Sequence, residues 1–185
     1  MDWREGEIRE LALDAFDQRF ARYRLQADET TRQAMIASLS RFGQRSFERR
    51  IHQARFRDEA ATLESFDWKF NRSIDRVQID ELATADFVRR GDNLVLAGQS
   101  GLGKSHIMQA VGRRACIAGD RVRYTTSAEL LRELGASLAD GTTPRKVRHY
   151  SRFDLLIIDE FGFDRLERDE FPQAPGLLYK VIDGR

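Results

Sequence analysis

Residues 98–105 read Gly-Gln-Ser-Gly-Leu-Gly-Lys-Ser and match every fixed position of the phosphate-binding loop pattern G-x-x-x-x-G-K-[ST]. An apolar run, residues 93–97, precedes the match, and a stretch with helical spacing follows it. Glycines allow backbone N–H groups to surround an anion, and the helix that follows directs its positive end at the same point. The stretch therefore predicts a strand–loop–helix unit. In it Lys104 would contact the β- and γ-phosphates of a nucleotide, and Ser105 would ligate Mg²⁺.

A second motif lies about fifty residues downstream, where an apolar run over 153–158 ends in Asp159 and Glu160. A continuous apolar run is typical of a parallel strand that is covered on both faces, and ligands bind at the carboxyl ends of such strands. Asp159 is placed to hold Mg²⁺, and Glu160 to orient and deprotonate the water that attacks the γ-phosphate. Taken alone, the same residues are also compatible with a solvated turn.

Strands alternate with helices around both motifs, which predicts a three-layer α/β fold with a parallel sheet, the architecture of a P-loop NTPase. Thr126 and Glu129 have the spacing of a helix capping box, and Pro175 is placed to open a helix. The expected elements are strands over 93–97, 121–125 and 154–158, helices over 104–118 and 126–139, a brief helix after the loop 140–144, and a short helix from 175.

The first 58 residues are predicted to be a separate, wholly helical region, and residues 59–185 the nucleotide-binding core. Apolar residues recur at three- and four-residue spacing over 8–23, and a second helix is expected over 28–43, ending near Gly43. A third helix would present Phe47, Ile51 and Ala54 inward. Residues 59–72 are expected to be irregular, and a helix over 74–90 would stop at Gly91, with Val77, Leu82, Ala85 and Val88 on its inner side.

The net charge is only +1, but only four of the 31 basic residues are lysines, and arginines are dense over residues 41–57. Arginine suits bidentate phosphate recognition, although a GC-rich genome would produce the same bias. The segment predicts a DNA-contacting surface with Arg41, Arg45, Arg49 and Arg50 as its candidates. A solvated helix face explains the same pattern, and the sequence leaves both interpretations open.

Other compositional features narrow the class of protein. Cys116 is the only cysteine, so no internal disulfide can form, and its place in the helix after the phosphate loop favours a small buried apolar role. The chain begins with charged residues rather than the apolar run of a signal peptide, and no stretch approaches 18 apolar residues. These features predict a cytoplasmic protein without a membrane span.

Several segments resemble IstB-like transposition helpers and DnaC-type helicase loaders of the AAA+ superfamily. The glutamate after Asp159 is typical of ATPases that drive motion. The likeness covers about residues 50–185 and is closer to the IstB-like proteins, chiefly through residues 53–67 and 122–130. The similar segments are Gly-Gln-Ser-Gly-Leu-Gly-Lys-Ser-His at 98–106, Val-Arg-Tyr-Thr-Thr-Ser-Ala-Glu-Leu at 122–130 and Leu-Leu-Ile-Ile-Asp-Glu-Phe-Gly at 155–162.

The resemblance implies an ATP- and Mg²⁺-dependent AAA+ ATPase that assembles on double-stranded DNA and assists a transposase. It also implies a homo-oligomer in which a neighbouring subunit supplies an arginine, and an adenine site near Phe66 or Leu63. In the alternative, the chain is a helicase loader that grips a replicative helicase through its N-terminal helices. A small-molecule phosphotransferase and an inactive remnant are further alternatives. The implied nucleotide-binding residues are Gly98, Gln99, Ser100, Gly101, Leu102, Gly103, Lys104, Ser105 and His106, with Glu160 and Lys104 catalytic.

The sequence departs from the resemblance at its C-terminal end, because the family continues well past position 185 with two further strands, a sensor residue and a helical lid. One of those strands is expected between the phosphate-loop strand and the Asp159 strand, and without it both would carry unpaired backbone groups. We therefore expect an incomplete core, from a gene fragment or an early-terminated copy, with low stability and weak or absent ATPase activity.

Overall fold

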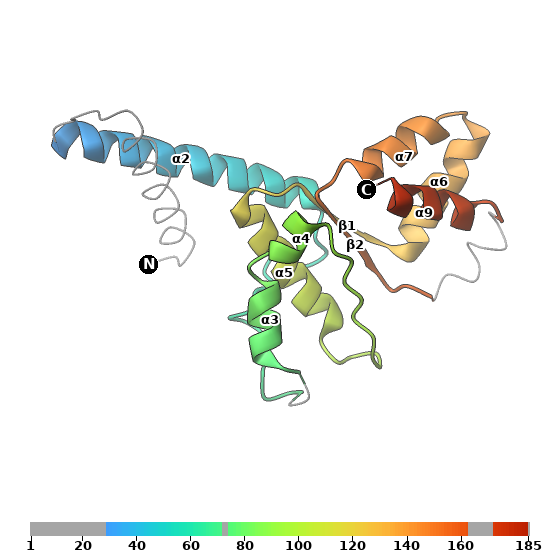
Figure 1. Ribbon diagram of the computed structural model, residues 1–185, viewed down its shortest axis with the longest axis horizontal. Helices are drawn as coiled ribbons and strands as arrows, with labels where there is room; N and C mark the ends of the chain where they lie inside the picture. Colours follow the sequence, from blue (N-terminus) through green and yellow to red (C-terminus); the bar gives the residue numbers. More distant parts are fainter. Residues whose placement is uncertain (1–28, 72–73, 163–171, 185) are drawn as a thin grey trace. The chain divides into compact units, whose positions relative to one another are not determined.

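The computed structural model describes residues 29–71, 74–162 and 172–184 (Figure 1). The chain divides into two compact units, Met1–Arg49 and Arg50–Arg185. The assignment of residues 1–58 to a separate helical region stays a prediction, and the helix expected over 8–23 lies outside the described residues. Within the described ranges, no helix combines the length and the apolar character that crossing a membrane requires.

The N-terminal described element is one long helix, α2 (Glu29–Ala54), rather than the two helices expected with a break near Gly43. A glycine inside a helix costs only about 1 kcal/mol relative to alanine, so good helix formers on both sides carry the helix through it. The expectation for the inward residues is confirmed, since Phe47, Ile51 and Ala54 are all buried.

The sheet of the second unit consists of two parallel strands, β1 (Val122–Thr126) and β2 (Leu155–Asp159). Their register pairs Val122 with Leu155 and Thr126 with Asp159, so both strands end at the same edge. Each lies within one residue of the predicted range. Strands alternating with helices around a parallel sheet confirm the α/β class and fit a partial P-loop NTPase core.

The strand expected over residues 93–97 does not form. Residues 92–99 are neither helical nor paired in a strand, and the Val95 side chain is 85% exposed. A strand needs a neighbour to accept its backbone hydrogen bonds, and the sheet of the described residues contains only β1 and β2. Residues 93–97 therefore have the apolar sequence of a strand but no neighbouring strand among the described residues to pair with.

Two groups of helices surround the sheet. Helix α5 (Lys104–Ala118) contacts both strands, and its bounds are those predicted. It packs closely on β2 because Gly112 has no side chain: a Cβ there would lie 2.6 Å from Ile157 Cδ1. Helices α6 (Ser127–Ala139), α7 (Thr143–Ser151) and α9 (Ala174–Asp183) share a separate apolar cluster. Its buried members are Leu130, Leu131, Leu134, Tyr150, Leu177, Leu178 and Val181.

Local signals set the ends of these helices as expected. The Thr126 hydroxyl accepts from the Glu129 N–H at 3.2 Å, and the Glu129 carboxylate accepts from the Thr126 N–H, which completes the capping box at the start of α6. Pro175 lies in the first turn of α9. Such caps satisfy backbone donors that the helix itself leaves free.

The single helix expected over 74–90 is instead two short ones, α3 (Arg76–Leu82) and α4 (Asp86–Arg90). Ala85 between them has a left-handed backbone with φ of 60°, and the Thr84 hydroxyl accepts from the Asp86 N–H. This local hydrogen bond competes with helix continuation. The break also changes the faces, because Val77, expected inside, is 77% exposed.

Candidate functional site

The glycine-rich loop leads directly into the first turn of α5, whose N-cap is Gly103 (Figure 1). Gly101 and Gly103 have φ angles of +80° and +87°, a conformation that side chains with a Cβ rarely adopt. Both positions therefore favour glycine, and the sequence pattern fixes the one at 103, whereas 101 is a variable position of the pattern. The N-terminal N–H groups of α5 are left for a ligand at this end of the helix.

Lys104 folds back over the loop that precedes it. Its Nζ donates hydrogen bonds to the carbonyl oxygens of Gly98 at 2.9 Å and Gln99 at 2.7 Å. The ammonium is thus held within the loop by neutral backbone acceptors. A phosphate would be a stronger partner for this cation, because charge-assisted hydrogen bonds are about twice as strong as neutral ones.

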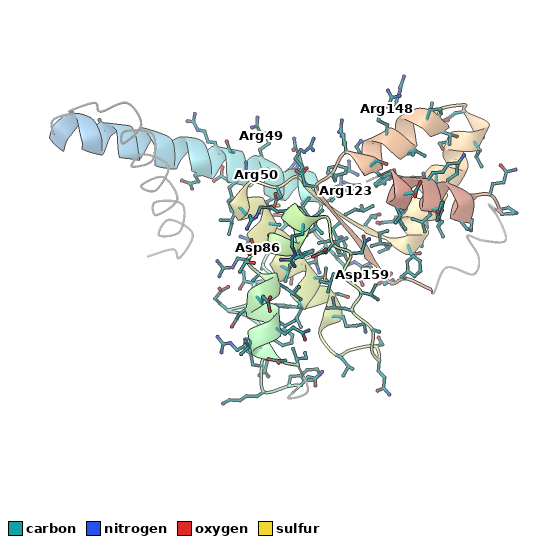
Figure 2. All side chains as sticks on the ribbon, in the orientation of Figure 1. Arg49, Arg50, Asp86, Arg123, Arg148 and Asp159 are labelled. Carbon is teal, nitrogen blue, oxygen red and sulfur yellow. The ribbon has the colours of Figure 1, made fainter. Side chains whose placement is uncertain are left out.

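The Asp159 carboxylate joins the second motif to the first. The Tyr124 hydroxyl donates to Asp159 Oδ2 at 2.7 Å, and the side chain of Ser105, next to Lys104, helps to lower the pKa of Asp159. Figure 2 shows Asp159 at the end of β2. Burial alone would raise the pKa of Asp159, but hydrogen bonds from Ser105 and Tyr124 outweigh burial and lower it. Ser105 of the first motif therefore acts on Asp159 of the second motif, and Asp159 is held as an anion.

Glu160 lies beside Asp159 in an uncommon backbone conformation, with φ of 56°. Its N–H donates to Asp159 Oδ1 at 2.8 Å, and its Oε1 accepts from Arg57 Nη1 at 2.9 Å. The hydrogen bond and the charge of Glu160 raise the pKa of Arg57. The Arg57 side chain is 59% exposed and the Glu160 side chain is 50% exposed. The Glu160 carboxylate is therefore accessible but neutralised by a cation.

An aromatic cluster lies against the last glycine of the loop. A Cβ on Gly103 would lie 2.6 Å from Phe66 Cε2, so the buried Phe66 ring touches the loop backbone. His106 packs on the same ring at 5.4 Å, and its Nε2 lies 2.8 Å from the Thr62 carbonyl oxygen. Trp68 meets Phe66 edge to face at 5.0 Å. Segment 62–68 thus forms a wall beside the loop, and its use by an adenine stays a prediction.

The donor set suits Mg²⁺. Ser105 and Asp159 offer hard oxygen ligands, and among the described residues no group of three or more His, Cys, Asp or Glu side chains is placed to hold a metal ion. Mg²⁺ is commonly bound through one or two protein oxygens together with substrate phosphates. The residues present fit that pattern.

The arginines proposed for DNA binding do not form one uniform set. Arg45 and Arg49 are exposed, whereas the Arg50 Nε donates to the Cys116 carbonyl oxygen at 2.7 Å and so caps the end of α5. Arg49 and Arg50 are labelled in Figure 2. The Arg41 side chain lies outside the described residues. Cys116 is fully buried as expected, and burial raises the pKa of its thiol to about 12.

Sequence reasoning missed two contributors to the site, Tyr124 and Arg57. Tyr124 was part of a predicted strand, and Arg57 was grouped with the other basic residues before residue 58. Arg57 lies 103 positions from Glu160, so no local spacing could connect them. For Tyr124, the paired register of β1 and β2 was needed, because it places a β1 side chain near the end of β2.

Comparison with known proteins agrees with this geometry. The family model for IstB-like ATP-binding proteins matches residues 7–185. One relative, named as an ATP-binding protein of insertion sequence IS21 from Pseudomonas aeruginosa, is 37% identical over 77% of this chain and 52% of its own length. A second, from insertion sequence IS1162 of Pseudomonas fluorescens, is 34% identical over 75% of this chain and 58% of its own length.

A third relative, from insertion sequence IS5376 of Geobacillus stearothermophilus, is 31% identical over 67% of this chain and 48% of its own length. The chain thus spans about half the length of the relatives it matches. The match over residues 7–185 takes in both motifs of the candidate site. The chain belongs to the family of IstB-like ATP-binding proteins, which are AAA+ proteins associated with insertion sequences.

Proposed function

We propose that this chain binds ATP together with Mg²⁺ and acts in transposition as a DNA-binding helper ATPase for a transposase. The observation that carries the proposal is the glycine-rich loop that opens α5, where the Lys104 ammonium is held by the carbonyl oxygens of Gly98 and Gln99. Lys104 and Ser105 lie in the first turn of α5, and Asp159 lies at the end of β2, the strand that α5 packs against. The names of the relatives support the link to insertion sequences.

In the proposed site, the phosphates would take the place of the carbonyl oxygens that hold the Lys104 ammonium. The loop N–H groups and the first turn of α5 would complete the cradle. Mg²⁺ bound by Ser105 and Asp159 would neutralise charge on the phosphate oxygens. Glu160 would orient the attacking water and accept its proton, after its carboxylate is released from Arg57.

Nucleotide binding is tested with Lys104→Ala, and Lys69→Ala is the matched control because Lys69 is exposed and lies outside the loop. We expect Lys104→Ala to weaken the binding of a fluorescent ATP analogue at least tenfold, since it removes a charge-assisted contact of about 1.5–3 kcal/mol. The control should bind as the unaltered chain does. Equal binding by all three would remove the nucleotide site from the proposal.

Hydrolysis is tested with Glu160→Gln, which keeps the size of the side chain and removes its basicity. We expect it to retain ATP binding and to lose turnover at least a hundredfold, the range of general base catalysis. Turnover should be measured with and without duplex DNA and in the presence of the transposase. Unchanged turnover in Glu160→Gln would assign the base to another group.

The DNA and transposase partners, and assembly with further copies of this chain, form a separate part of the proposal. The basic character of the segment before residue 58 supports it, with Arg45 and Arg49 exposed. We expect the chain to bind short duplexes with an affinity that falls steeply with salt. Co-purification with a transposase, rather than with a replicative helicase, would separate the proposal from a loader of helicases.

A further inference from the structure

Helix α7 carries a dense basic sequence that was not among the DNA-binding candidates. Residues 141–153 contain Arg145, Lys146, Arg148, His149 and Arg152 and no acidic residue. The helix is anchored from its other side, where Tyr150 is fully buried and Val147 packs on the cluster shared with α6 and α9. The basic side chains are therefore displayed from a helix with a fixed orientation in its unit.

The basic side chains of α7 differ in whether they have an acidic partner. Lys146 is paired with Glu133 at 3.0 Å, and Glu133 also accepts from the Tyr150 hydroxyl at 2.8 Å, so this lysine belongs to the packing of α7 on α6. In contrast, Arg145, Arg148 and the C-cap residue Arg152 are exposed and make no ion pair or hydrogen bond with any described residue, although the Arg152 guanidinium lies over the Phe153 ring at 5.7 Å. We call these three the α7 arginines.

Several other arginines of the same unit have acidic partners, which the α7 arginines lack among the described residues. Arg76 pairs with Asp80, Arg89 with Asp86 and Arg90 with Asp92. Arg57, Arg114 and Arg121 are paired as well. Single cations such as Arg55, Lys69 and Lys180 are also exposed without an ion pair to a described residue, but among the described residues of this unit three such cations lie close together only at α7.

The α7 arginines also lie in line. Steps of three and four residues place them on one face of the helix, over a length of about 10 Å at 1.5 Å per residue. Figure 2 shows Arg148 projecting from α7 on the side away from α9. Burial lowers the pKa of the neighbouring His149, and the charges of Arg152, Arg123 and Lys146 lower it further, as expected beside a positive surface.

We infer that the α7 arginines form a contact surface for the phosphates of duplex DNA, additional to the arginines of α2. This inference rests on the proposed function and names a second place where the DNA would bind. Arginine suits the role because its planar guanidinium binds phosphate through two parallel hydrogen bonds.

The chemistry of α7 favours nucleic acid over a protein partner. Protein interfaces place large apolar side chains at their centre, whereas DNA interfaces are polar and positively charged. None of the exposed large apolar side chains of the described residues lies on α7. The surface offers positive charge and hydrogen-bond donors without an apolar anchor.

The test compares two triple variants of the full chain with the same loss of charge. The first is Arg145→Gln, Arg148→Gln, Arg152→Gln, and the matched control is Arg76→Gln, Arg89→Gln, Arg90→Gln, whose arginines are paired with aspartates. Affinity for a short DNA duplex is measured by fluorescence anisotropy from about 50 to 200 mM salt. Thermal unfolding and ATP-analogue binding check that both variants are folded.

We expect the α7 variant to lose at least tenfold in affinity at the lowest salt. The slope of log affinity against log salt should become shallower by about 2.7, because each phosphate contact contributes roughly 0.9. The control should keep the slope of the unaltered chain. Equal changes in both variants, or an unchanged slope in the α7 variant, would overturn the inference while DNA binding by the chain stands.

Two further outcomes are informative. If the unaltered chain binds the ATP analogue but no duplex, both the DNA part of the proposed function and this inference are overturned. If the α7 variant loses binding to a polyglutamate peptide but keeps its affinity for duplex DNA, the surface belongs to an acidic protein partner, and the inference is overturned alone.

Discussion

Two glycines of the phosphate loop allow backbone strain to be separated from a steric clash. Gly101 and Gly103 have nearly equal φ angles, +80° and +87°, so an alanine at either position is strained to a similar degree. A Cβ on Gly101 would meet nothing within 4 Å, whereas one on Gly103 would lie 2.6 and 2.9 Å from two atoms of the Phe66 ring. Comparing Gly103→Ala with Gly101→Ala therefore isolates the contact with Phe66.

The expected magnitudes follow from these two causes. The left-handed backbone costs an L-residue about 1–2 kcal/mol, which is the whole effect expected for Gly101→Ala. Overpacking adds about 1–3 kcal/mol, because the Phe66 ring is 8% exposed and held by Trp68 and His106, so it has little room to move. We therefore expect Gly103→Ala to lower the free energy of unfolding by about 2–5 kcal/mol.

The assay is urea unfolding followed by Trp fluorescence, with the free energy obtained by linear extrapolation. A double-mutant cycle with Phe66→Leu completes it, because a smaller side chain should reduce the cost of Gly103→Ala to that of Gly101→Ala. If the two alanine variants lose the same stability, or if Phe66→Leu leaves the difference between them unchanged, the contact between Phe66 and the loop does not govern its stability.

The remaining predictions concern single groups of the site and of α5. Because the ion pair between Arg57 and Glu160 is exposed, Arg57→Gln should change the free energy of unfolding by less than about 1 kcal/mol. It should raise ATP turnover at most about fivefold, the equivalent of the same free energy. Abolished turnover would show that Arg57 acts in hydrolysis itself. Tyr124→Phe removes only the hydroxyl that donates to Asp159. It should therefore raise the Mg²⁺ concentration needed for half-maximal binding of an ATP analogue and leave binding without Mg²⁺ unchanged. An equal change in both conditions would mean general loss of structure. The Cys116 thiol, with a pKa raised by burial from 9.0 to about 12, favours the folded state below pH 9, and this stabilisation is lost as the pH rises towards 12. Alkylation of native protein at pH 8 should be slow and should accelerate with urea, whereas rapid native labelling would contradict the burial of this residue.

Features that depend on neighbouring residues in the chain were predictable. The glycine-rich loop, the bounds of α5 and the capping box of Thr126 and Glu129 each depend on spacings of a few residues, and hydrogen bonds within that range decide them. The strand that ends at Asp159 was predictable for a similar reason, because its continuous apolar run specifies burial on both faces.

Contacts between distant segments were not predictable from spacing. Arg57 and Glu160 are 103 positions apart, and Tyr124 reaches Asp159 only through the register of β1 and β2. The same limit explains why the basic segment before residue 58 looked uniform in sequence. Only the tertiary structure shows that Arg50 caps α5 and Arg57 pairs with Glu160, while the α7 arginines have no acidic partner within 29–71, 74–162 and 172–184.

The sequence by itself determined that residues 98–103 form a glycine-rich loop ahead of α5, because its glycines permit backbone conformations that other residues resist. It could not determine that the apolar run at 93–97 would remain outside the sheet. A helix satisfies its backbone hydrogen bonds within its own segment, whereas a strand needs another segment beside it. Whether such a partner is present is decided only when the whole chain has folded, and for residues 93–97 the described structure contains none.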